Sequence, residues 1–317
     1  MNVIWDIISS PSFYYSILRV TTPILLAALA AFIADKAGLI NMGLEGIMLS
    51  SALTGVVVSA ATSNVWLGLL GAIVMGLIIG LIMAYSALNL KTDIILTGIA
   101  VNLMAGGGSI FFLYVFAGNK GNSTSLNSGT LPTIDIPLIE NIPILGEIIS
   151  GHNILTYFAF IMVFVMFVLI SKTTLGLRIR SVGENDDAAA SVGISKNKIR
   201  YLALAISGML AGVAGAYMSM GYVSWFSQNM TAGRGFIALA AETMGASSPL
   251  ATMVTSLIFG TAEAVSISIA SLGLPPEMIQ AIPYIVTLIG LVVNSVRKEN
   301  KRKAIIREQK IAADNNS

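Results

Sequence analysis

The chain has 317 residues, of which 55% are hydrophobic and only 11% are charged, and its mean hydropathy is +0.82. A soluble domain carries about a quarter charged residues, so this composition predicts an all-α, polytopic membrane protein that forms one transmembrane domain over 1–317. The chain contains no cysteine and one histidine, His152. Disulfides, Cys/His metal sites and the usual Ser-His or Cys-His catalytic pairs are thereby excluded, and we expect a protein that is not an enzyme.

Apolar runs of about 20 residues recur along the chain, and each is long enough to cross a bilayer of ~30 Å as a helix. The segment before the first run contains Asp6 but no basic residue, which is atypical of a cleavable signal, so we expect the first span to stay as the insertion signal. A tenth span would form if 3–16 also enters the membrane, and that choice decides the side of the N-terminus. The run at 234–247 is short enough to be a half-helix. Nine spans are predicted in all, at about 18–34, 44–61, 65–88, 93–117, 154–171, 201–222, 234–247, 250–271 and 280–296.

Basic residues are concentrated in two short segments of the chain. Of the 18 Lys and Arg, six lie in 172–200 and seven lie in 297–310. Short loops rich in Lys and Arg stay on the cytoplasmic side. The segment 172–200 is therefore predicted to be a cytoplasmic loop, and 297–317 a cytoplasmic tail that lies against anionic membrane lipid. The loop 118–153, where Lys120 is the only basic residue, is predicted to be external.

Two segments place polar side chains among small and apolar residues. The stretch AGLINMGLEGIMLSSALTG (37–55) contains Asn41 and Glu45, and GIAVNLMAGGGSIFF (98–112) contains Asn102 one turn before three glycines. Polar groups inside a membrane are costly and are functional hypotheses by default, and consecutive glycines weaken a helix. The three side chains are candidates for a polar lining. The alternative is that they hold helix ends or helix contacts.

Further carboxylates and glycines within the spans have competing interpretations. An ion-coupled transporter would use buried carboxylates such as Glu45, Glu242 and Glu263, but each could instead be held at a helix N-terminus or by polar neighbours. The stretches GLIIG (76–80) and GMLAG (208–212) have the G-x-x-x-G form, which predicts close packing of two membrane helices.

The stretch GLRIRSVGENDDAAASVGISKNKIRYLA (176–203) predicts a short helix on the cytoplasmic face. Asp186 and Asp187 can cap it, Ala188–Ala190 favour it and Gly193 can end it. Such a helix is suited to docking into another protein, although an ordinary connecting loop has the same composition. The chain contains no G-x-x-x-x-G-K-[ST] motif, so ATP-driven transport would need a separate ATPase.

Five stretches of the chain form a familiar series: GLINMGLEGIMLSSALTG, GIAVNLM, LGLRIRSVGENDDAAASVGIS, ISGMLAGVAGAYM and MTAGRGFIALAAETMG. Together they resemble the permease subunit of an ABC importer, in the superfamily of the ribose-type sugar and branched-chain amino-acid permeases. The sequences INMGLEG and MTAGRGFIALA are most similar to those of the nucleoside branch. The resemblance covers about Ile24 to Asn294.

The resemblance implies an ABC importer permease fold in the plasma membrane of a bacterium, and a role as the path for nucleoside uptake. It implies four partners: a cytoplasmic ABC ATPase that binds the ATP, a second permease subunit that is a homologue or a copy, an external nucleoside-binding lipoprotein, and membrane lipid. No cofactor in this chain and no nucleic acid are expected. The alternatives are a similar permease for a simple sugar such as ribose, or an ion-coupled secondary transporter.

Two groups of site residues follow from the polar positions and the resemblance. A neutral nucleoside needs amide, hydroxyl and aromatic partners, and the chain offers these near span ends or bends. The predicted translocation path comprises Asn41, Glu45, Asn102, Ser207, Thr231 and Phe236. The resemblance makes 183–193 the helix that docks on the ATPase, with Gly183, Glu184, Asn185, Ala188 and Gly193 as its candidates.

Overall fold

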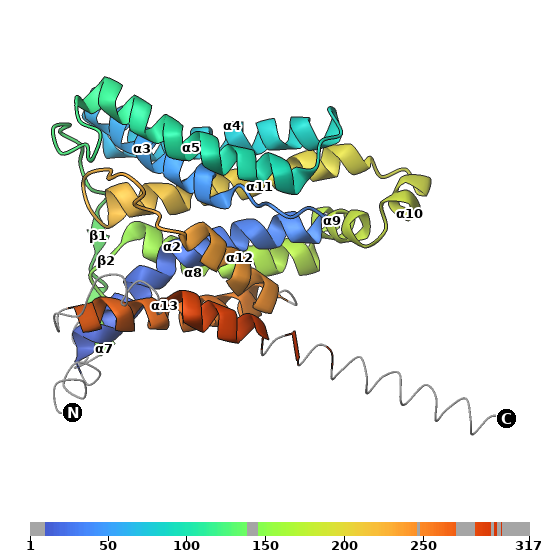
Figure 1. The fold of residues 1–317 in the computed structure, drawn as a ribbon. Helices are drawn as coiled ribbons and strands as arrows, with labels where there is room; N and C mark the ends of the chain where they lie inside the picture. The colour runs from blue at the N-terminus through green and yellow to red at the C-terminus, as the bar shows by residue number, and fades with distance from the viewer. Residues whose placement is uncertain are drawn as a thin grey trace.

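Seven helices in the part of the chain that the structure describes are long and apolar enough to cross a membrane (Figure 1). The structure is a computed structural model, and it describes residues 10–137, 145–245, 248–270, 283–292, 295, 296 and 299. The long helices are α2 (Pro11–Lys36), α3 (Leu44–Thr62), α4 (Val65–Leu88), α5 (Ile94–Ala117), α8 (Ile154–Lys172), α11 (Lys196–Ala216), which continues as the π-helix η1 (Tyr217–Gly221), and α13 (Pro249–Ala270). The predicted all-α membrane fold is confirmed.

Shorter elements lie at the two ends of the bundle and inside it. They are α7 (Leu145–Ile149), α9 (Thr174–Glu184), α10 (Asp186–Ser191), α12 (Arg234–Gly245), a short apolar helix over Pro283–Val292, and the strands β1 (Thr133–Ile134) and β2 (His152–Asn153), which pair antiparallel. Figure 1 shows β1 and β2 at one end of the bundle and α10 at the opposite end. The loops that the sequence places on different sides of the membrane therefore lie at opposite ends of the molecule.

The predicted spans agree closely with α3, α4 and α5 and differ in detail elsewhere. The first helix begins at Pro11 rather than near residue 18, because proline is well tolerated in the first turn. The predicted span 234–247 is α12, whose 12 residues cover about 18 Å at 1.5 Å per residue. It is the half-helix that its length suggested. Of the proposed segment 3–16, residues 3–9 lie outside the described residues, and residues 11–16 belong to α2. Parts of 280–296 and most of 297–317 also lie outside the described residues.

Both G-x-x-x-G stretches lie in helix contacts, as predicted, and the structure shows that they meet each other where α4 crosses α11. A Cβ atom added at Gly76 would collide with the carbonyl oxygen of Gly208. One added at Gly212 would lie 2.7 Å from the carbonyl oxygen of Ala72. Without a hydrophobic driving force between helices in lipid, such close backbone approach is a main source of association. The glycines at this crossing therefore let α11 lie against α4 and fix the centre of the bundle.

Candidate functional site

The chain is not helical between α2 and α3, and Asn41 holds this break in place. The Asn41 side chain is only 1% exposed. Its Nδ2 donates to Ser207 Oγ at 2.9 Å, and its Oδ1 accepts from the backbone N–H of Gly43 at 3.1 Å. The Ser207 hydroxyl in turn donates to the carbonyl oxygen of Ala30 at 2.6 Å. These bonds tie the break 37–43 to α2 and α11.

Asn102 on α5 completes the break from the other side. Its Oδ1 accepts from the backbone N–H of Gly46, and its Nδ2 donates to the carbonyl oxygen of Met42, each at 2.8 Å. A broken helix in a membrane leaves backbone groups that need partners other than water. The two amides supply them, so Asn41 and Asn102 hold helix ends, which was the alternative to a polar lining.

Glu45 on α3 caps the half-helix α12. Its Oε1 accepts from the backbone N–H of Gly233 and its Oε2 from that of Gly235, each at 2.7 Å. The first N–H groups of a helix have no intrahelical partners and carry a partial positive charge. A carboxylate that binds two of them is therefore well placed, although it comes from a different helix.

An ion pair and a tyrosine surround the same helix end. Arg234 Nη2 binds Glu263 Oε1 on α13, and Arg234 Nη1 donates to the carbonyl oxygen of Met230 at 3.1 Å. Tyr284 donates its hydroxyl to the carbonyl oxygen of Ala232 at 2.9 Å. We call this set the central junction, and it comprises residues 41–46, Asn102, residues 231–235, Glu263 and Tyr284.

The six residues predicted for the path gather at or beside the central junction, but most of them face inward. Ser207 and Thr231 are fully buried, whereas the Phe236 side chain is 44% exposed. Glu45 and Asn102 are partly buried. Arg234 was not among the site residues predicted from the sequence. The available signal was that Arg234 is the only basic residue between 201 and 296, in a stretch that also contains Glu242 and Glu263.

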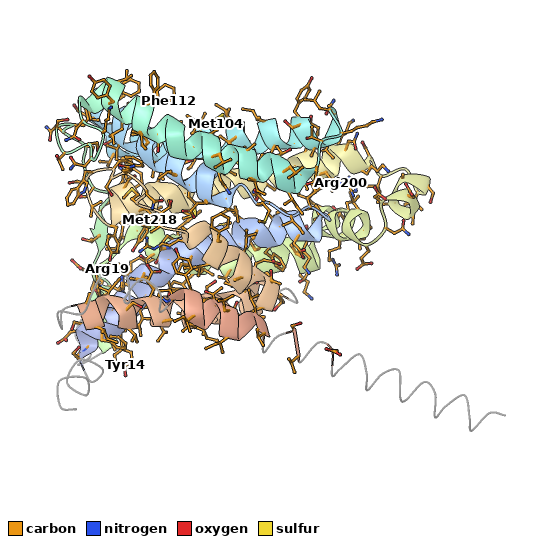
Figure 2. The ribbon with its side chains drawn as sticks, in the orientation of Figure 1. Tyr14, Arg19, Met104, Phe112, Arg200 and Met218 are labelled. Carbon is orange, nitrogen blue, oxygen red and sulfur yellow. The ribbon has the colours of Figure 1, made fainter. Side chains whose placement is uncertain are left out.

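The three consecutive glycines of α5 lie on an open face. A Cβ atom added at Gly106, Gly107 or Gly108 would meet nothing within 4 Å. Met104 and Phe112, labelled in Figure 2, are largely exposed on the same helix and line an apolar groove of about 530 Å³ between α3, α4 and α5. These glycines are therefore not part of a helix contact within the chain.

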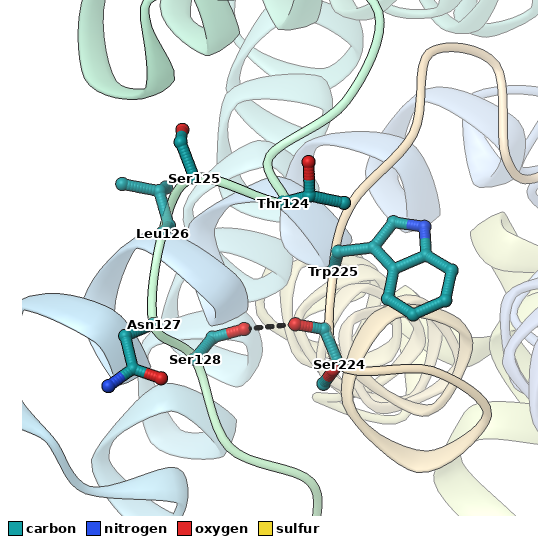
Figure 3. Close-up of a pocket in the computed structure, with 7 residues that line it drawn as sticks. All are labelled: Thr124, Ser125, Leu126, Asn127, Ser128, Ser224 and Trp225. Atoms are coloured by element: carbon teal, nitrogen blue, oxygen red, sulfur yellow. Dashed lines mark hydrogen bonds between the residues drawn. The ribbon is translucent and has the colours of Figure 1, made fainter.

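A small polar pocket of about 230 Å³ lies at the end of the bundle that the sequence predicts to be external (Figure 3). Ser128 Oγ bonds the carbonyl oxygen of Ser224 across it. This bond joins the loop after α5 to the segment that connects η1 with α12. The lining residues are Thr124, Ser125, Leu126, Asn127, Ser128, Ser224 and Trp225.

The predicted short helix on the basic loop is α10, but its cap is Asn185 rather than an aspartate. Asn185 Oδ1 accepts from the backbone N–H of Ala188 at 2.9 Å. Asp186 and Asp187 occupy the first turn, and Lys196 Nζ binds them at 3.1 and 3.2 Å. The hydrogen bond from Lys196 lowers the pKa of Asp186. The aspartates therefore fasten α10 to the start of α11.

The candidate coupling residues fall into two groups. Glu184, Ala188 and Gly193 are exposed, and Gly193 adopts a left-handed φ of +85° with open space around its Cα. Gly183 is different, since a Cβ atom there would collide with the carbonyl oxygen of Lys36. All five candidates are exposed on the basic loop, but Gly183 also permits a close backbone contact inside the chain.

The sequence matches the family described as "Branched-chain amino acid transport system / permease component" over residues 13–291. The chain belongs to this family. It is a membrane permease of an ABC transporter and not an enzyme. Its helices fit a multi-pass protein of the cell membrane.

Several proteins resemble this permease over most of its length. The nucleoside ABC transporter permease protein NupC of Lactococcus lactis is 32% identical over 87% of the chain and 90% of the relative. The guanosine permease protein NupQ of Bacillus subtilis is 33% identical over 85% and 87%. The "Putative glucose ABC transporter permease protein TsgC13" of Haloferax volcanii is 30% identical over 91% and 93%.

A solved structure shares the fold of the permease. The complex titled PsaBC from Streptococcus pneumoniae with Fab matches 90% of this chain and 95% of its own chain, with a TM-score of 0.55 and 17% identity. At that identity the likeness concerns the fold alone. The half-helix α12 and the break 37–43 are irregular backbone, which is tolerated at membrane depth only inside protein or beside a cavity.

Proposed function

We propose that this permease is the membrane path for nucleosides in an ABC importer. The observation that carries the substrate class is the occupied N-terminus of α12, where Glu45 binds the N–H groups of Gly233 and Gly235. A free helix N-terminus inside a membrane protein attracts anionic groups. Here that positive end is already neutralised, and Arg234 is paired with Glu263. The junction thus offers no fixed charge to an amino-acid carboxylate or a phosphate, which favours a neutral solute.

Aromatic and sulfur-containing surface favours a nucleoside over a simple sugar. A nucleoside has a flat base that packs on apolar rings, whereas a monosaccharide is polar on most of its surface. Phe236 at α12, and Met104 and Phe112 on α5, are exposed. The names of the Lactococcus and Bacillus relatives support the same substrate class, while that of the Haloferax relative supports glucose, the second candidate.

The partners follow from the same arrangement. The ATPase docks on α10, whose exposed residues face away from the bundle. A second permease subunit faces the open side of α5 at Gly106–Gly108, and the path runs between that face and Phe236. An external lipoprotein delivers the nucleoside at the end that carries β1 and β2. ATP binds to the ATPase and no cofactor binds to this chain.

Uptake of labelled nucleosides tests the proposal. A strain that lacks the gene should lose uptake of several purine and pyrimidine nucleosides, and the restored gene should return it. Unlabelled nucleosides should compete with one another, whereas ribose, glucose, leucine and nucleotides should not.

Inactivation of the partner ATPase should stop uptake, since the chain has no phosphate-binding loop. Competition by glucose but not by nucleosides would assign the second candidate, and uptake that only an ionophore stops would contradict ATP-driven transport.

Reporter fusions test the orientation that the proposal requires. Fusions after residue 190 and after residue 305 are expected to be cytoplasmic, because 13 of the 18 basic residues lie in those two segments. A fusion after residue 130 is expected to be external. An external reporter at residue 190 would place α10 on the wrong side for an ATPase.

A further inference from the structure

The end of α9 touches the turn that follows α2. A Cβ atom added at Gly38 would lie 3.3 Å from the Cα atom of Gly183, and one added at Gly183 would lie 3.1 Å from the backbone nitrogen of Gly38. Gly38 also adopts a left-handed φ of +76°, a conformation that favours glycine. Two backbones thus meet directly where the basic loop approaches the break 37–43.

Arg200 joins the same two segments through its side chain. Its Nη1 pairs with Asp186 Oδ2 of α10 at 3.2 Å. Its Nε points to the carbonyl oxygen of Ala37 at a longer distance of 3.5 Å, and its Nη2 would lie 3.8 Å from a Cβ atom at Gly38. Figure 2 shows Arg200 at the end of the molecule where α10 lies. A planar guanidinium with several donors can hold two partners at once.

The break leads from this contact to the central junction within a few residues. Asn41 is bonded to Ser207 on α11, and Asn102 is bonded to Met42 and Gly46. Glu45 lies in the first turn of α3, directly after the break, and accepts hydrogen bonds from the first N–H groups of α12. A displacement of residues 37–38 would therefore pass along the backbone of the break to Glu45, and from Glu45 through its two hydrogen bonds to the start of α12.

We infer that Arg200, together with the contact between Gly183 and Gly38, transmits movement of α10 to the break 37–43 and thereby to α12. The inference rests on the proposed docking of the ATPase at α10. Arg200 is a positioning residue here, because it touches neither ATP nor the transported solute. It makes the break respond to the nucleotide state of the ATPase.

A single introduced thiol can report this movement, because the natural chain contains no cysteine. Ile40 lies in the break and is 49% exposed. In the complete transporter reconstituted with its ATPase, the Ile40→Cys variant is labelled by a water-soluble maleimide without nucleotide and after trapping with ATP and vanadate. We expect the two labelling rates to differ by about fivefold or more, in the range typical of coupled sites. Adding Arg200→Gln should reduce the difference to less than about twofold.

Lys198→Gln is the matched control. Lys198 is exposed on α11 two residues before Arg200, so the variant removes the same charge nearby without touching the break. It should keep the nucleotide-dependent labelling and normal uptake, whereas Arg200→Gln should lower uptake about tenfold with ATP hydrolysis retained.

The inference is overturned if Arg200→Gln keeps the labelling difference, or if the Ile40→Cys variant alone shows none. Hydrolysis and uptake that fall together in an assembled Arg200→Gln complex would also overturn it. An ATPase that does not co-purify with the unaltered permease would instead refute the proposed function. The labelling requires no nucleoside, so an error in the substrate class would leave this test intact.

Discussion

Replacing Glu45 by leucine is expected to abolish uptake and to destabilise the permease markedly. The two N–H groups at the start of α12, on Gly233 and Gly235, would lose their acceptor. A hydrogen bond to a charged group contributes roughly 1.5–3 kcal/mol, so the loss of both is expected to cost about 3–6 kcal/mol. In detergent, the variant should lose monomeric protein at a lower temperature, as size-exclusion chromatography after heating would record.

Two further variants separate the cap from the general effect of charge. Glu45→Gln keeps one oxygen acceptor but points an amide donor at the other N–H, so we expect partial stability and strongly reduced uptake. Glu147→Gln is the control, because Glu147 is an exposed carboxylate on α7, far from α12 along the chain. It should behave like the unaltered protein. A Glu45→Leu protein with normal thermal stability and uptake would contradict the capping role of this carboxylate.

The sequence could identify the polar residues of the junction but not their partners. Asn41, Glu45 and Asn102 stand out because polar side chains are rare in membrane spans. Glu45 and the N–H donors of Gly233 and Gly235 are separated by 188 and 190 residues, and no local pattern encodes such a pairing. The choice between a polar lining and a helix cap depends on that pairing, which only the three-dimensional arrangement supplies.

The span boundaries illustrate the same limit at the level of secondary structure. Hydropathy predicts the position of α4 and α5 well, since a bilayer sets one length for every complete span. It also marks 234–247 as too short for a complete span, and α12 is the half-helix that this length indicates. It also places the start of α11 at 201 instead of Lys196, because the basic first turn of that helix lies outside the apolar run.

Two glycines of the basic loop have different structural roles that the residue type alone does not reveal. Gly183 and Gly193 lie ten residues apart on the same loop and were grouped as coupling residues. The first permits two backbones to touch, and the second permits a left-handed turn at an open surface. Both uses need the absence of a side chain, so the sequence alone does not distinguish them.

Replacing Val192 by aspartate is expected to separate the permease from its ATPase. Val192 follows α10, and its apolar side chain is 75% exposed at the end of the molecule where the ATPase is proposed to dock. If α10 inserts into a pocket of the ATPase, an aspartate there would bury an unpaired charge at a cost of several kcal/mol. Each ~1.4 kcal/mol lowers the association constant tenfold, so co-purification of the ATPase should fall by about 100-fold.

The aspartate should leave the permease itself intact. The Val192 side chain takes no part in the hydrogen bonds of Asn185 and Lys196 that hold α10, so membrane insertion and thermal stability should stay close to those of the unaltered chain. Val192→Leu, which keeps an apolar side chain at the same place, should retain both the ATPase and uptake. Uptake should track co-purification across the two variants, because docking is the step that both share. A Val192→Asp permease that still co-purifies with the ATPase and transports at the normal rate would contradict docking at 183–193. The segment would then be an ordinary connecting loop.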